Sequence, residues 1–256
     1  MSSKKNNGRN IGPRAEKGLE EMRDDFIWIL THQLRTLITP IKLFSDMLLT
    51  DRLGSLSAKQ RSYVEDIHQA ASRIVEVVRD ILNGYRIQTG EIELVYESTC
   101  LEDLIESILE KRNSFEGDAS CDIRLLKAER PICDVPVDRV LVRQVVIVLL
   151  SNAIKYSRKD RCAITVSVGL DEANDAVLIR VADKGIGIPE EARRHIFVGP
   201  FRASNALKMH PDGLGFDLYI AKLIITRLEG DIWFDSEADK GTTFTISLPL
   251  HPQTRE

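Results

Sequence analysis

The sequence predicts two kinds of structure in series: an antiparallel helical hairpin, expected to pair into a four-helix bundle, and then an α/β sandwich whose mixed sheet carries helices on one face. Three observations support this prediction. Apolar residues recur every three or four positions from about residue 26 to residue 85, with one short interruption. Strand-like and helix-like runs alternate after Gly90. The chain has 256 residues, 43% of them apolar, which is enough for two domains with separate cores.

The first segment, residues 15–50, is predicted to be one long amphipathic helix. Its apolar stripe consists of Phe26, Leu30, Leu34, Leu37, Ile41, Phe44 and Leu48. After a turn at 51–56, Ser57-x-x-Gln60 has the form of a capping box and begins a second helix. The second stripe consists of Val64, Ile67, Ala71, Ile74, Val78, Ile81 and Tyr85. A hairpin of two such helices leaves apolar surface uncovered, so residues 15–89 are expected to form a homodimer.

Residues 90–250 are predicted to form the α/β domain. Strands are expected at 91–97, 121–127, 162–170 and 176–182, and helices at 101–113 and 137–156. A glycine-rich turn, a short helix at 190–196 and an irregular stretch up to Gly213 follow, before a helix that ends at Leu228. Two last strands, 231–236 and 242–248, are expected to form a hairpin. We expect a disordered tail at 1–14 and a second tail at 251–256.

The composition argues against several classes of function. A net charge of −4 gives no sign of a basic surface for nucleic acid or for an anionic membrane. No apolar run approaches the roughly 20 residues of a membrane helix. We therefore expect a cytoplasmic protein. The soluble portion of a membrane receptor, or a partner of one, is compatible with this expectation. The four cysteines are scattered without metal-binding spacing, and reduced thiols are expected in that compartment: Cys100, Cys121, Cys133 and Cys162.

Residues 149–157 are the most informative segment of the second domain. They place the carboxamide of Asn152, the ammonium of Lys155 and the ring of Tyr156 at the end of an apolar helix. Magnesium prefers hard oxygen ligands and keeps several waters, so a carboxamide beside phosphate oxygens is a suitable shell for a metal-bound nucleotide. The alternative for Asn152, taken alone, is a helix C-cap.

Three further segments follow in order. Asp183-Lys184-Gly185-Ile186-Gly187 comes after a strand, and its glycines allow backbone to approach a ligand closely. Residues 197–202 end in Arg202, and Gly213-Leu214-Gly215 precedes a helix whose first amides suit an anion. Each glycine pair, taken alone, is equally consistent with an ordinary tight turn.

His32 is the candidate nucleophile of the first helix. It is two residues from both Leu30 and Leu34, which places it about 200° around the helix from the apolar stripe. We therefore expect an exposed histidine, which on its own is most simply a surface residue.

The four segments of the second domain resemble the N, G1, F and G2 boxes of the histidine-kinase ATP-binding domain, and residues 31–36 resemble the H box of that family. The resemblance covers roughly residues 20–250. It implies a GHKL-type fold for the second domain, with ATP and Mg²⁺ as cofactors. It also implies that the dimer acts with the receiver domain of a response regulator, whose aspartate accepts the phosphoryl group.

The resemblance also implies roles for single residues. His32 would be the phosphoacceptor, Thr36 would position water for regulator dephosphorylation, and Arg202 would reach the γ-phosphate. Asn152 would ligate Mg²⁺, Lys155 would lie near the phosphates and Tyr156 beside the adenine. The base would be bound by Asp183, Gly185 and Gly187, and the lid would begin at Gly213 and Gly215.

Several positions depart from the family pattern. Gln33 stands where an acidic residue is usual and cannot act as a base, Leu37 replaces a proline, and Val148 replaces a second asparagine. The remaining departures are Lys184 for asparagine, Pro200 for an aromatic residue and Asp217 for glycine in the lid motif. An anionic Asp217 at a helix N-terminus would compete with phosphate for the helix dipole.

These observations lead to one prediction and two alternatives. The prediction is an ATP-dependent protein-histidine autokinase that phosphorylates a response regulator, with weakened catalysis. The first alternative is a catalytically impaired, dimeric interaction or nucleotide-sensing module. The second, an ATPase or chaperone with the same nucleotide-binding domain, leaves the histidine-bearing hairpin without a purpose.

Overall fold

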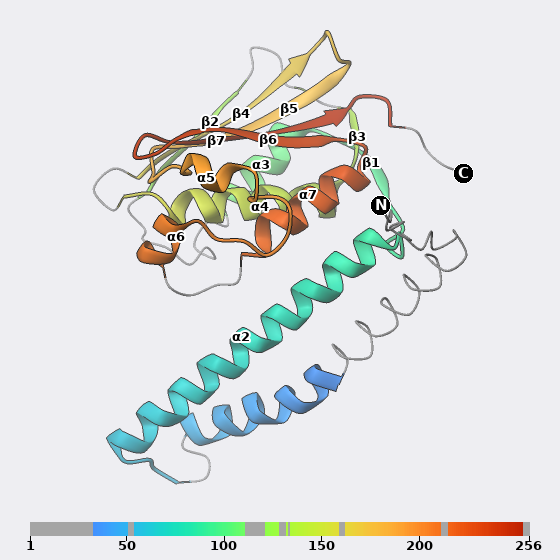
Figure 1. The fold of residues 1–256 in the computed structure, drawn as a ribbon. Coiled ribbons are helices and arrows are strands. Elements are labelled where there is room, and N and C mark those ends of the chain that lie inside the picture. Colours follow the sequence, from blue (N-terminus) through green and yellow to red (C-terminus); the bar gives the residue numbers. More distant parts are fainter. Residues whose placement is uncertain are drawn as a thin grey trace, which may run out of the picture. The chain divides into compact units, whose positions relative to one another are not determined.

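The computed structural model describes residues 33–50, 54–110, 121–127, 132, 134–158, 162–210 and 215–252. They fall into two compact units that divide between Tyr85 and Arg86, and each unit is described by itself. Figure 1 shows the helical hairpin and the α/β unit. The tail predicted at 1–14 and the beginning of the first predicted helix lie outside the described residues.

The described part of the first unit contains the helix 33–49 and α2 (Ala58–Gln88), whose last residues extend past the boundary. The predicted capping box is confirmed, because the Ser57 amide donates to Gln60 Oε1 at 2.9 Å and the Gln60 amide donates to Ser57 Oγ at 3.4 Å. Polar contacts link the two helices. Ser45 Oγ lies 3.1 Å from His68 Nδ1, and Arg61 donates to the Leu49 carbonyl at 3.2 Å.

The apolar stripes of the hairpin are only partly covered within one chain. Ala71 and Val78 are buried, whereas Leu37, Phe44 and Ile67 are 65%, 60% and 50% exposed. Large apolar side chains that stay exposed on a helix pair are typical of an interaction surface.

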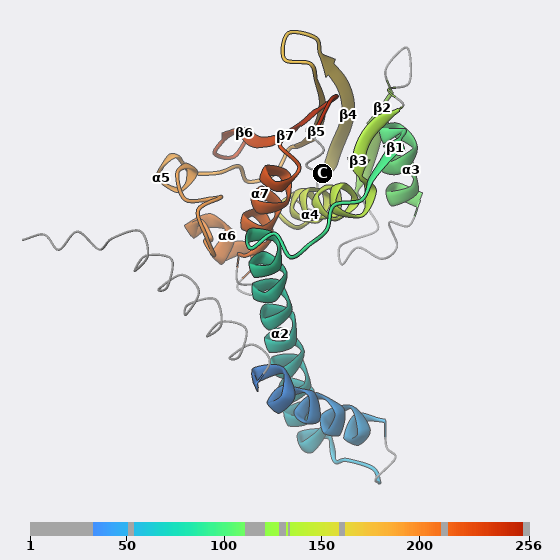
Figure 2. The ribbon, with the colours of Figure 1, turned by 90° about the vertical axis from the view of Figure 1, so that its right-hand side faces the viewer.

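The second unit is built on a five-stranded mixed sheet with strand order β2-β4-β5-β7-β6. Strand β2 runs parallel to β4, and the other neighbours are antiparallel. Its strands are β2 (Asp122–Leu126), β4 (Ala163–Asp171), β5 (Ala176–Asp183), β6 (Asp231–Glu237) and β7 (Gly241–Pro249). Figures 1 and 2 show that α3 (Leu101–Glu110), α4 (Arg139–Lys155) and α7 (Asp217–Arg227) cover one face. The predicted fold class is confirmed.

Helix α4 runs through the centre of the core and ends at the pocket. Asp138 caps its N-terminus, with Oδ1 accepting from the amides of Val140 and Leu141 at 3.0 Å each. The buried side chains of α4 are apolar: Leu141, Val142, Val145, Val146, Leu149, Leu150 and Ala153. This packing fixes the last turn of α4, which carries Asn152 and Lys155.

The edges of the α/β unit differ from the sequence-based prediction. Strand β1 is Tyr96–Thr99 instead of 91–97, and it pairs with β3 (Val135–Asp138), which was not predicted. Pro136 lies within β3 and argues against a strand, but β3 belongs to a separate two-stranded sheet where a missing donor is tolerated. A short helix, α6 (Ser204–Met209), occupies the stretch expected to be irregular. Residues 111–113 of the predicted helix lie outside the described residues.

The prediction of reduced cysteines is wrong. Cys100 is disulfide-bonded, and Cys121 and Cys162 form a disulfide with each other, with their Cα atoms 4.7 Å apart. The reason is the parallel pairing of β2 with β4. Asp122 is in register with Ala163, and the Asp122 amide donates to the Cys162 carbonyl at 2.9 Å. Cys121 and Cys162, which directly precede β2 and β4, are therefore neighbours. Scattered spacing in the sequence gave no sign of this proximity.

Candidate functional site

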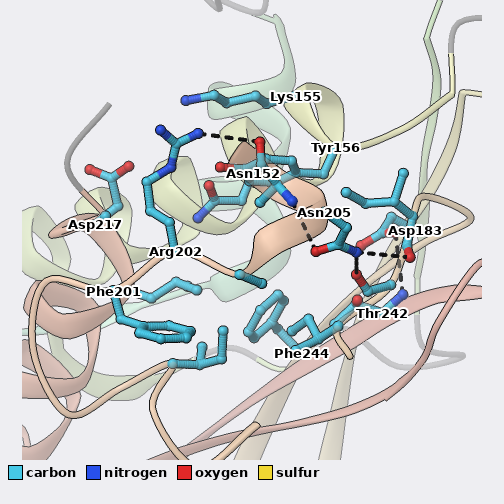
Figure 3. Close-up of a pocket in the computed structure, with 18 residues that line it drawn as sticks. Asn152, Lys155, Tyr156, Asp183, Phe201, Arg202, Asn205, Asp217, Thr242 and Phe244 are labelled. Atoms are coloured by element: carbon cyan, nitrogen blue, oxygen red, sulfur yellow. Dashed lines mark hydrogen bonds between the residues drawn. The ribbon is translucent and has the colours of Figure 1, made fainter. Parts of the chain in front are cut away.

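A pocket in the α/β unit gathers side chains from segments far apart in the sequence. They come from the end of α4, the end of β5 and the turn after it, the stretch 201–206, the start of α7, and β7 (Figure 3). Its lining residues include Asn152, Lys155, Tyr156, Asp183, Ile186, Gly187, Phe201, Arg202, Asn205, Gly215, Asp217, Thr242 and Phe244. Seven of the residues named as nucleotide contacts or catalytic residues from the sequence therefore lie around one cavity: Asn152, Lys155, Tyr156, Asp183, Gly187, Arg202 and Gly215.

One end of the pocket is organised around the carboxylate of Asp183. Its Oδ1 accepts from the amide of Gly185 at 2.7 Å and from the amide of Thr242 at 3.2 Å. Burial raises the pKa of Asp183 from 3.8 to about 6, and these two backbone hydrogen bonds oppose the increase. The second oxygen remains available to accept from a ligand. A buried carboxylate in an apolar pocket suits a neutral donor such as an aromatic amino group.

The turn after β5 requires its glycines. A Cβ on Gly185 would lie 2.3 Å from the Tyr156 carbonyl oxygen, and one on Gly187 would lie 2.0 Å from the Glu237 carbonyl oxygen. Gly187 also has a φ of +62°, which favours glycine. Gly187 lines the pocket. Gly185 is not among the lining residues, and its amide shapes the turn by donating to Asp183 Oδ1.

The opposite end of the pocket carries the charged groups. Figure 3 shows Lys155, Arg202 and Asp217 at the end away from Asp183 and Thr242. Arg202 donates to the carbonyls of Ala206 and His210, so its guanidinium is held by the backbone around α6. Two cations at this end favour an anionic ligand, and the carboxylate of Asp217 opposes it.

Aromatic side chains pack the segment between α5 (Glu190–Arg193) and α6. The Phe197 ring lies 5.8 Å from that of Phe234 and 6.3 Å from that of Phe244, and His195 lies 5.3 Å from Phe201. Pro200 of this segment stands where the family pattern has an aromatic residue. The neighbouring phenylalanines supply that packing without an aromatic residue at position 200.

Two other departures from the family pattern lie outside the pocket lining. Val148 is partly buried against the main hydrophobic core, so its side chain replaces a polar group with core packing. Lys184 is exposed and is not among the lining residues.

The lining residues that the sequence did not single out include Asn205, Thr242 and Phe244. Thr242 and Phe244 belong to β7, and the antiparallel pairing of β7 with β5 brings them beside Asp183, with Ala182 in register with Thr243. The predicted hairpin 231–248 contained both residues, but its pairing with β5 carried no local signal. Asn205 lies on α6, whose existence was not predicted.

Three of the predicted site residues are not placed at the pocket. His32 and Gly213 lie outside the described residues. Thr36 is exposed on the helix 33–49 of the other unit. Among the described residues, no cluster of three or more His, Cys, Asp and Glu is placed to hold a metal ion.

Comparison with known proteins decides the family. The family described as "His Kinase A (phospho-acceptor) domain" matches residues 22–90, and "Histidine kinase-, DNA gyrase B-, and HSP90-like ATPase" matches residues 137–252. The chain belongs to the histidine kinase family. Its two parts are those of a sensor histidine kinase core, in the order that the H, N, G1, F and G2 segments indicated. None of the helices that the structure describes is long and apolar enough to cross a membrane.

The curated relatives that the chain matches are longer than the chain. It is 29% identical over 232 residues to the "Non-motile and phage-resistance protein" of Caulobacter vibrioides, covering 89% of the chain and 27% of the relative. The "Circadian input-output histidine kinase CikA" of Synechococcus elongatus is 28% identical, covering 89% of the chain and 30% of the relative. For the "Adaptive-response sensory kinase SasA" of Rippkaea orientalis the values are 30%, 87% and 56%. The chain thus spans between about a quarter and three-fifths of these relatives.

Solved structures share the fold. Full-length ShkA in complex with AMPPNP matches with a TM-score of 0.71 at 22% identity, covering 88% of this chain and 45% of that one. The Acinetobacter baumannii histidine kinase AdeS matches with a TM-score of 0.58 at 22% identity, covering 86% and 98%. At this identity the likeness concerns the fold alone.

Proposed function

We propose that this chain is the catalytic core of an ATP-dependent protein-histidine autokinase in two-component signalling. A neutral imidazole nitrogen of His32 attacks the γ-phosphorus of ATP. A nitrogen–phosphorus bond forms while the bond between the γ-phosphorus and the β,γ-bridging oxygen breaks. ADP leaves, and the imidazole proton passes to water. An aspartate of a response regulator then takes the phosphoryl group from His32.

The polarity of the pocket supports this proposal best. A buried carboxylate, Asp183, lies at one end, where it can accept a hydrogen bond from the adenine amino group. Lys155 and Arg202 line the other end, where the phosphates of the same nucleotide would be neutralised. Tyr156 lies between them and supplies an aromatic face for the base. ATP carries its base at one end and its phosphates at the other, so it matches the order of these groups along the pocket.

Magnesium is proposed to be held by Asn152 together with phosphate oxygens and water. The Asn152 carboxamide lines the pocket and offers a hard oxygen donor, which fits a cation that keeps several waters. When bound, Mg²⁺ supplies charge neutralisation at the phosphates. The guanidinium of Arg202 would hold the nucleotide in position. Gly215 would contribute indirectly, because it allows the backbone before α7 to pass close to Phe201.

A second candidate function is nucleotide sensing without turnover. Gln33, next to His32, is exposed and cannot accept a proton, and the loss of a general base typically slows a reaction about 10²–10⁴-fold. Asp217 adds a carboxylate to the phosphate end of the pocket. Between sensing without turnover and slow kinase activity, we infer slow kinase activity, because phosphoryl transfer depends chiefly on positioning and charge neutralisation.

The hairpin is proposed to form a homodimer through its exposed apolar stripe, which includes Leu37, Phe44 and Ile67. Joining two hairpins into a four-helix bundle would bury these side chains. The receiver domain of a response regulator would dock on the outer face of the same bundle. There, the exposed hydroxyl of Thr36, one turn after His32, would position water for regulator dephosphorylation.

Labelling with γ-phosphate-labelled ATP and Mg²⁺ tests the proposal. The wild-type chain should give an acid-labile, alkali-stable phosphoprotein, and His32→Gln should abolish the label. A matched control, His251→Gln, changes a histidine that is 85% exposed and should leave the label intact. Nucleotide binding without label would favour the sensing module, whereas absence of both binding and label would exclude the two candidates together.

A further inference from the structure

Helix α6 covers one side of the pocket with little apolar anchoring of its own. All six of its described residues, Ser204–Met209, are exposed or half-buried, and Leu207 is 47% exposed. A helix of this length is unstable in isolation, because nucleation fixes several residues for few hydrogen bonds. Contacts to neighbouring segments must therefore hold α6 in place.

Asn205 makes the polar contact between α6 and the base end of the pocket. Its Nδ2 donates to the Gly187 carbonyl at 2.9 Å, with the Ile186 carbonyl at 3.5 Å. Figure 3 shows the Asn205 carboxamide pointing from α6 toward the turn after Asp183. Two carbonyl oxygens face this side chain, so only a hydrogen-bond donor is accommodated there.

The turn that receives Asn205 is rigid. The Ile186 amide donates to the Tyr156 carbonyl at 3.1 Å, and the Ile186 carbonyl accepts from the Asp239 amide at 2.9 Å. The Ile188 amide donates to Ser236 Oγ at 2.8 Å. The turn is thus fixed to α4 on one side and to the β6–β7 hairpin on the other. The hydrogen bonds of Asn205 attach a weakly held helix to this fixed support.

We propose that Asn205 is a positioning residue that holds α6 closed over the base end of the pocket and thereby sets the rate at which nucleotide leaves. This inference rests on the proposed function for the identity of the ligand. Asn205 acts through α6, since its donor atom is already used by the turn. Loss of one such hydrogen bond typically changes an equilibrium about two- to tenfold. An anion facing two carbonyls would change it further.

The first measurement needs no nucleotide. Hydrogen exchange of residues 203–210 and trypsin cleavage after Lys208 both report the opening of α6 in the full chain. Asn205→Asp, which keeps the shape but removes the donor, should raise both rates about tenfold, and Asn205→Ala should raise them by a smaller factor. Ser204→Ala, on the exposed preceding residue of the same helix, should leave both rates within about twofold. Equal rates in Asn205→Asp and wild type would overturn the proposal.

The second measurement uses MgAMP-PNP. Its dissociation rate should rise about tenfold in Asn205→Asp, with the association rate and the Ser204→Ala control little changed. Faster opening of α6 with an unchanged dissociation rate would overturn the link to nucleotide release. If wild type does not bind MgAMP-PNP, the proposed function fails, and the exchange and cleavage rates still decide whether Asn205 holds α6.

Discussion

Replacing Asp183 by asparagine is expected to stabilise the ATP-binding unit at neutral pH while weakening nucleotide binding. Burial raises the pKa of this carboxyl from 3.8 to about 6. Each tenfold change in proton affinity corresponds to about 1.4 kcal/mol, so ionised Asp183 costs the folded state about 3 kcal/mol at pH 7. Asparagine retains the Oδ1 acceptor for Gly185 and Thr242 and carries no charge.

The sign of the pH effect follows from proton binding. The folded state holds the Asp183 proton more tightly than the unfolded state, so between about pH 4 and pH 6 this group makes the free energy of unfolding fall as pH rises. With a folded pKa of about 6, its contribution drops by about 1.4 kcal/mol between pH 5 and pH 7.5. The Asp183→Asn variant lacks that slope, and the other carboxyl groups titrate alike in both proteins.

Urea unfolding followed by tryptophan fluorescence measures this difference. The chain has two tryptophans, and a Trp28→Phe background leaves only Trp233, which lies on β6. The variant should be more stable than its parent at pH 7.5, with a smaller advantage at pH 5. A variant less stable than its parent at pH 7.5, or an equal advantage at both values, would refute the argument. In calorimetry, parent affinity for MgATP should fall about tenfold from pH 7.5 to pH 5, as the ionised fraction of Asp183 decreases.

The other perturbations concern charge, backbone conformation and the disulfide. Asp217→Asn should raise MgATP affinity about tenfold in calorimetry, because a like-charge pair at about 4 Å costs about 1–4 kcal/mol; an unchanged affinity would remove Asp217 as a reason for weak binding. Gly215→Ala should weaken MgAMP-PNP binding, since φ is +73° and a Cβ would lie 2.3 Å from the Phe201 carbonyl oxygen; retained affinity would contradict this. Replacing Cys121 and Cys162 by alanine should lower the free energy of unfolding by about 4 kcal/mol for a loop of this length, measured in urea without reductant. Equal stability in the double variant and the parent would indicate that the bond is absent in solution.

Residues whose role is local could be predicted from the sequence. Asn152, Lys155 and Tyr156 lie within one helical turn of each other, and the apolar face of α4 determines where that turn ends. Asp183 is the last residue of β5, and Gly187 lies in the turn that follows it. Hydrophobic periodicity and glycine placement were sufficient for these elements because the interactions that fix them are close in sequence.

Residues brought in by long-range pairing could not be predicted. Thr242 reaches Asp183 only because β7 pairs with β5, and the two cysteines meet only because β2 runs parallel to β4. Neither pairing follows from alternation within a strand. Asn205 was missed for a different reason. Helix α6 has no apolar periodicity that would predict it, and the hydrogen bonding of Asn205 to the turn at 186–188 leaves no pattern in the sequence.

The two glycines that line the pocket have a consequence for inhibitor design. Gly187 and Gly215 present backbone to the cavity, and a side chain at either position would meet a carbonyl oxygen at 2.0 Å or 2.3 Å. A compound that draws its affinity from these backbone surfaces would be difficult to escape by point mutation, because the substitutions that reshape the surface also strain the fold. Resistance would then be expected to arise at side-chain contacts such as Phe201 or Leu218, where a substitution changes the shape of the pocket without displacing the backbone.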